Sequence, residues 1–130
     1  MTDYGTSVTL QQPFDEVVAA VRAALAGQGF GVLTEIDVQA TMKAKLDLDR
    51  APYLILGACN PPLAHRALQV DPSVGLLLPC NVVVRQTDEG TIVAAIDPMM
   101  MVSVSGNTAL KLVADEAAGM LKAALAALTA

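Results

Sequence analysis

The chain has 130 residues and a net charge of −5, with 8 basic against 13 acidic residues. Apolar residues make up 54% of it, charged residues only 16% and aromatic residues 3%. Phosphate backbones and anionic membrane surfaces are bound through clustered Lys and Arg, so we expect neither nucleic acid nor a membrane as partner. The length predicts one domain over residues 1–130.

The apolar residues occur in short runs, and none reaches the roughly 18 residues that a membrane span needs. The first residues also lack the basic and apolar segments of a secretory signal. We therefore expect a cytoplasmic protein with reduced thiols. So few charges on so apolar a chain indicate that part of the surface is buried in a homo-oligomer.

The first predicted elements are a strand, a helix and a second strand. The opening strand runs from Tyr4 to Leu10, and Pro13 suits the first turn of the helix that follows. Gly27 or Gly29 ends this helix, and Phe30 to Ile36 is the second strand. Apolar residues recur along the helix at spacings of three and four, at Phe14, Val17, Val18, Val21 and Leu25.

Short capped helices are predicted on either side of a third strand. Asp37 can cap a helix from Val38 to about Leu46, because its carboxylate accepts unpaired backbone N–H groups. Asn60 can cap a second one from Pro61 to about Val70. The apolar run from Tyr53 to Ala58 between them has strand length.

The next predicted strand is long and interrupted. It covers Val74 to Arg85 and breaks at Pro79, since proline cannot donate to a strand ladder. Gly90 closes a hairpin turn into the return strand Thr91 to Ile96.

The C-terminal part is predicted to be mainly helical. Met99–Met101 form one short turn, residues 103–107 form a loop, and the last helix begins near Thr108. The apolar face of this helix consists of Leu110, Val113, Ala117, Leu121, Ala124, Leu125 and Leu128. The whole pattern predicts an α+β fold, with a mostly antiparallel sheet of about five strands and the two long helices on one face.

Four segments of the chain resemble one family. They are residues 34–41, 53–67 and 74–84 and the triplet Ile96–Pro98. The family is the bacterial and archaeal family of domains of unknown function numbered three hundred and two. The resemblance implies a strand–helix–four strands–helix order similar to the TATA-binding-protein type, and homodimers. It implies no activity. The chain departs from the family pattern at Asn107-Thr108, where Asn-Pro is expected.

Several polar and sulfur-bearing residues are expected to converge at one end of the sheet. In an antiparallel pair, the end of the third strand lies beside the start of the fourth. This places Cys59 and Asn60 near Cys80 and Asn81, and the end of the return strand brings Asp97 to the same place. These five residues form the predicted ligand-binding site, to which we add His65 and Glu35.

The two cysteines leave alternatives open. Cys59 precedes a helix N-terminus, which can raise its thiolate fraction, so it is the best catalytic candidate, with Cys80 as its resolving partner. The thiols of Cys59 and Cys80 are also suitable ligands for a soft metal ion. Buried free cysteine is also a common core residue, and this simpler interpretation holds for both.

His65 and Glu35 are the weaker members of the set. His65 is expected on the exposed side of its helix, and Glu35 on an exposed strand face unless it projects into a groove. A metal site of Cys59, Cys80 and His65 would lack a fourth ligand and matches no zinc spacing, so no metal is predicted. The sequence indicates no particular cofactor.

Three functions remain compatible with these residues. The first is a homodimeric module that binds a small ligand or a partner in a pocket lined by Cys and Asn, and we favour it. The second is a thiol-dependent redox or sulfur-relay enzyme that uses Cys59 with Cys80. The third is a structural interaction domain in which both cysteines are core residues.

Overall fold

The computed structural model describes residues 3–130 as an α+β fold. In chain order the elements are β1 (Gly5–Leu10), α1 (Phe14–Gly27), β2 (Gly31–Asp37), α2 (Val38–Leu46), β3 (Tyr53–Cys59), α3 (Pro61–Val70), the 3-10 helix η1 (Pro72–Leu77), β4 (Cys80–Thr87), β5 (Gly90–Ile96), α4 (Met100–Ser105), the 3-10 helix η2 (Thr108–Leu110) and α5 (Lys111–Leu128). The five strands form an antiparallel sheet in the order β1-β5-β4-β3-β2. The predicted fold class is therefore confirmed.

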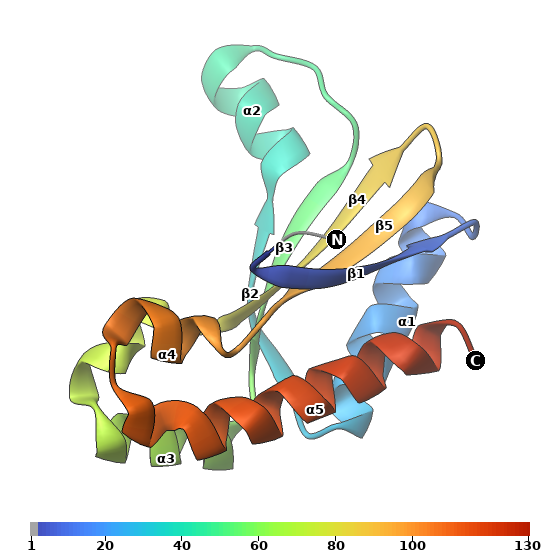
Figure 1. Ribbon diagram of the computed structural model, residues 1–130. Coiled ribbons are helices and arrows are strands. Elements are labelled where there is room, and N and C mark those ends of the chain that lie inside the picture. Colours follow the sequence, from blue (N-terminus) through green and yellow to red (C-terminus); the bar gives the residue numbers. More distant parts are fainter. Residues whose placement is uncertain (1–2) are drawn as a thin grey trace.

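One face of the sheet carries the main hydrophobic core. Leu56, Val82 and Ala95 are register partners in one row across β3, β4 and β5, and all three are buried. The long helices α1 and α5 pack against this face and against each other (Figure 1). The apolar face predicted for the first helix is confirmed, since Val17 and Leu25 belong to this cluster.

A second hydrophobic cluster lies beyond the end of the sheet. It joins α3, η1, α4 and the start of α5 through Leu63, Val74, Met101, Leu110 and Val113. In Figure 1, α3 and α4 lie beside the N-terminal half of α5. This cluster matters for function because it packs beside the point where β3 ends and β4 begins.

Both predicted helix caps are present. The Asp37 carboxylate accepts a hydrogen bond from the backbone N–H of Ala40 at 2.9 Å, and α2 covers the predicted residues. The Asn60 side chain caps α3. Gly90 takes a φ of 134° in the hairpin, as its position in the turn predicted.

Two predicted segments are wrong. Residues 74–77 belong to η1 instead of a strand, because the Asp71 carboxylate accepts from the N–H of Ser73 and starts a helical turn that buries Val74. Residues 103–105 continue α4 instead of forming a loop, and this helix ends at Gly106 with a φ of 69°. In both places a local helix cap determines the backbone conformation.

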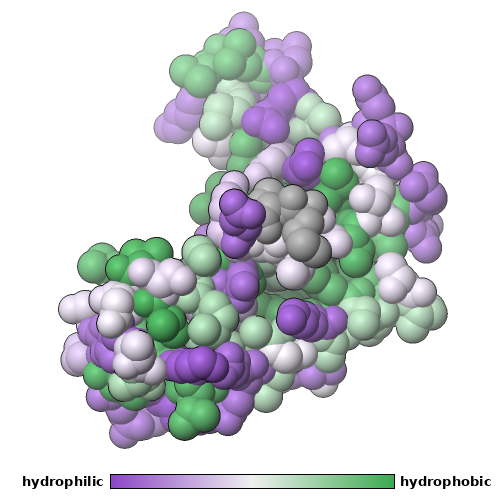
Figure 2. Space-filling model, viewed as in Figure 1, coloured by the Kyte–Doolittle hydropathy of each residue, from purple (hydrophilic) through white to green (hydrophobic). Residues whose placement is uncertain are grey.

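Helix α2 projects from the body of the molecule as an arm (Figure 1). None of its side chains is buried. Figure 2 shows the surface hollowed between this arm and the region of α3 and α4. Within residues 3–130, the helices are too short or too polar to cross a membrane. The likeness to the TATA-binding-protein type stays a prediction.

Candidate functional site

The candidate site lies at the end of the sheet where β3 leads into α3. Cys59 is the last residue of β3 and pairs with Gly31, whereas Cys80 is the first residue of β4 and pairs with Ala58. Asn60 follows as the cap of α3. The expected strand pairing therefore brings the end of β3 and the start of β4 to the same rim of the sheet.

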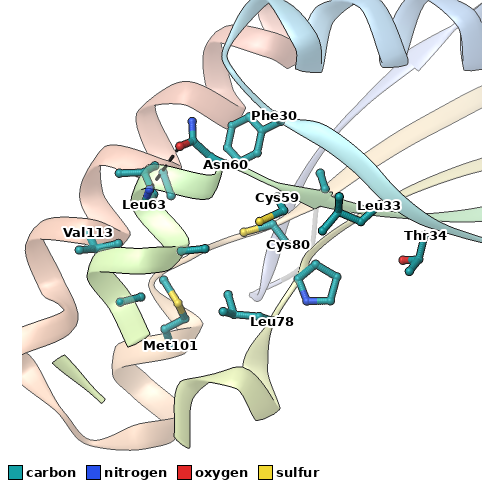
Figure 3. Close-up of a pocket in the computed structure, with 15 residues that line it drawn as sticks. Phe30, Leu33, Thr34, Cys59, Asn60, Leu63, Leu78, Cys80, Met101 and Val113 are labelled. Carbon is teal, nitrogen blue, oxygen red and sulfur yellow. Dashed lines mark hydrogen bonds between the residues drawn. The ribbon is translucent and has the colours of Figure 1, made fainter. Parts of the chain in front are cut away.

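A pocket of about 270 Å³ opens at this rim (Figure 3). Its walls come from β2, β3, α3, α4, α5 and the segment before β4. The lining residues are Phe30, Leu33, Thr34, Ala58, Cys59, Asn60, Leu63, Ala64, Ala67, Leu78, Pro79, Cys80, Met101, Val113 and Ala117. No charged side chain is found among these described residues. We call this cavity the rim pocket.

Both thiols line the rim pocket, are half-buried and are free. Burial, and then the charge of Cys59, raise the pKa of the Cys80 thiol from 9.0 to about 11. Cys80 is therefore protonated at neutral pH. A protonated thiol is a weak nucleophile and a small, polarisable wall group for a ligand.

Asn60 is buried, and both ends of its carboxamide make hydrogen bonds within the protein. Its oxygen accepts from the N–H of Leu63 at 3.3 Å. Its nitrogen donates to the carbonyl of Gln28 at 3.4 Å and contacts the Met120 sulfur at 3.6 Å. The side chain thus ties the start of α3 to the end of α1 and to α5, and offers a ligand little hydrogen bonding.

Asn81 and Asp97 line a different cavity. This second pocket also contains Tyr4, and it shares Leu78, Pro79, Cys80 and Met101 with the rim pocket. The Asp97 carboxylate accepts from the N–H of Met99 at 3.0 Å and so holds the turn before α4. The five residues that were expected to converge are therefore divided between two neighbouring pockets.

His65 and Glu35 lie outside both pockets. His65 is exposed on α3, as the sequence predicted. Glu35 is exposed on β2 and pairs with Arg22 at 2.5 Å. Across residues 3–130, no group of three or more His, Cys, Asp or Glu side chains is placed to hold a metal ion.

Much of the rim pocket was missed in the sequence. Val113 and Ala117 were identified only as part of the apolar face of the last helix, and Met101 only as part of a short turn. Gly57 lies behind two of the lining residues. A Cβ there would collide with the Thr34 hydroxyl and lie 2.9 Å from Cγ of Pro79, so Thr34 and Pro79 pack this closely only over glycine.

The comparisons with known proteins agree with this fold. Residues 6–128 match the family described as "Domain of unknown function DUF302". A crystal structure of the uncharacterized conserved protein DUF302 from Bacillus stearothermophilus superimposes with a TM-score of 0.90 and 31% sequence identity. The match covers 98% of this chain and 99% of that one. No curated protein matches the chain.

The chain therefore belongs to the DUF302 family, as its sequence motifs indicated. Membership brings a fold and no activity with it, because fold alone does not carry function.

Proposed function

We propose that this protein is a small-ligand-binding module whose site is the rim pocket. The observation that carries the proposal is the pocket itself, a concave cavity at the meeting point of the sheet rim and three helices. Such preformed apolar pockets are the usual sites for small molecules. Leu33 and Thr34 are exposed and give a ligand access from solvent.

A thiol enzyme is the weaker alternative. Thiol chemistry is favoured by a base, a cation or a helix N-terminus beside the sulfur, because each promotes the thiolate. The described residues that line the pocket include no base and no cation, which leaves only the start of α3 beside Cys59, and the raised pKa of Cys80 opposes ionisation. A redox pairing of Cys59 with Cys80 remains a proposal supported only by their sharing one pocket. Free thiols accord with the cytoplasmic location that we propose.

The proposal includes a homodimer. Three of the exposed large apolar side chains fall in one stretch from the end of β2 to the connection after α2, at Ile36, Leu46 and Leu48. Their exposed fractions run from 50% to 60%. Strand β2 is also a sheet edge with unpaired backbone groups. Hydrophobic residues are visible on the arm in Figure 2, and a second copy would bury them.

The ligand function is tested with a set of small neutral, anionic and cationic fragments in saturation-transfer NMR. Ala64→Phe places a ring into the rim pocket from α3, and Ala123→Phe makes the same change on the exposed side of α5. The proposal expects at least one fragment to bind the wild type and Ala123→Phe but not Ala64→Phe. It fails if no fragment binds, or if Ala64→Phe binds as well as the wild type while circular dichroism shows it folded.

A further inference from the structure

Resting on the binding function proposed above, we infer that the ligand group held in the rim pocket is neutral and hydrocarbon-like. First, the walls of the pocket are almost entirely apolar. All lining residues except Thr34 and Asn60 have no polar side-chain atom other than sulfur. Two of them are Cys59 and Cys80, whose thiols are weak donors and acceptors.

The second step concerns the few polar atoms that remain. The carboxamide of Asn60 already bonds Leu63 and Gln28, and the side chain is buried, so it offers a ligand little hydrogen bonding. The Thr34 hydroxyl belongs to an exposed residue at the solvent side. A polar ligand atom deep in the pocket would therefore lose its water and gain no partner, which is unfavourable.

The third step is the absence of charge in these walls. A carboxylate, phosphate or ammonium group in the pocket would lie among the described lining residues without a counter-ion. An unpaired ion in apolar surroundings is among the most unfavourable arrangements in proteins. The pocket thus selects against both signs of charge, although the chain as a whole carries −5.

The volume sets the size of the group. A cavity of about 150 Å³ with apolar walls accommodates benzene, and drug-sized ligands occupy pockets of about 300–1,000 Å³. At about 270 Å³ the rim pocket suits a group of roughly two rings or a short branched chain. In Figure 3, Phe30 and Met101 lie at opposite ends of the pocket with both thiols between them. Sulfur and ring walls are favourable for aromatic groups.

Three probes that share one ring system test this class. They are naphthalene, 2-naphthoate and 2-naphthylmethylammonium, titrated into the full chain and followed by NMR of methyl groups. Naphthalene is expected to bind, with both charged probes weaker by at least about tenfold because the charge must be desolvated. Ala64→Phe should abolish naphthalene binding and Ala123→Phe should leave it unchanged.

The outcomes separate the two proposals. If either charged probe binds as tightly as naphthalene and is lost in Ala64→Phe, the neutral class is wrong while the binding function stands. If naphthalene binds equally well to folded Ala64→Phe, it occupies another surface and the class inference is wrong. If none of the three probes binds, the class is also wrong, and the fragment set above then decides whether the pocket binds anything.

Discussion

The Asn60 side-chain oxygen accepts a hydrogen bond from the backbone N–H of Leu63, inside the wall of the rim pocket. The residue is 8% exposed, so its partners cannot be replaced freely by water. Asn60→Ala is expected to lower the free energy of unfolding by about 1–2 kcal/mol, as for loss of a helix cap. Urea denaturation measures the change.

Asn60→Asp keeps the cap oxygen and removes the donor to Gln28, so it separates the two roles of the side chain. The exposed Asn81→Ala is the control, expected within about 0.5 kcal/mol of wild type. Equal stability of Asn60→Ala and Asn81→Ala would contradict the structural role of Asn60.

Gly57 lies directly behind Thr34 and Pro79, two residues that line the rim pocket. Gly57→Ala should cost about 1–3 kcal/mol in unfolding free energy, because the new methyl group would meet Thr34 and Pro79. Gly75→Ala is the matched control, since nothing lies within 4 Å of a Cβ there. Adding Thr34→Ala to Gly57→Ala should recover part of the loss. If Gly57→Ala leaves the unfolding free energy unchanged, the predicted steric conflict with Thr34 and Pro79 is wrong.

Cys80 makes stability depend on pH in the alkaline range. The unfolded chain ionises this thiol near pH 9.0, whereas the folded protein keeps the proton until about pH 11. The folded state therefore binds more protons between these values, and the Cys80 contribution to stability is present below pH 9 and is lost as pH rises to 11.

The size of this loss is about 2 kcal/mol at pH 11 by the linkage relation. Denaturation curves of the wild type and Cys80→Ala across this range measure it as a difference, which cancels the other titrating groups. If the two proteins lose stability in parallel from pH 8 to 11, the thiol is not shifted as described.

The proposed homodimer gives a mass prediction. Sedimentation equilibrium at micromolar concentration should return twice the chain mass of 13.4 kDa. Ile36→Lys should shift the mass toward the monomer, because it puts a charge on the exposed edge strand. Leu112→Lys, at a side chain that is 73% exposed on α5, should not. A wild-type mass equal to that of the monomer would contradict the proposed homodimer.

The sequence predicted the architecture better than the site. The apolar run of β3 and the three-and-four spacing in α1 and α5 are strong local signals, and Asp37 and Asn60 are clear caps. The errors at residues 74–77 and 103–105 arose because local features, the Asp71 cap and Gly106, set the backbone conformation there.

The site was predicted only in part because it depends on tertiary packing. Strand pairing suggested the rim, and Cys59, Asn60 and Cys80 do line one pocket there. The cavity itself arises from how α3, α4 and α5 meet, through Met101, Val113 and Ala117, and no sequence spacing reports that. The same packing assigns Asn81 and Asp97 to the neighbouring pocket.

The most direct test of the central proposal is the location of methyl chemical-shift changes on titration with naphthalene. If naphthalene binds in the rim pocket, the methyl shifts of Leu63, Met101 and Val113 are expected to change, because these side chains line the pocket. Changes confined to Ile55 and Val83 on the other face of the sheet, or no changes at all, would contradict the proposal.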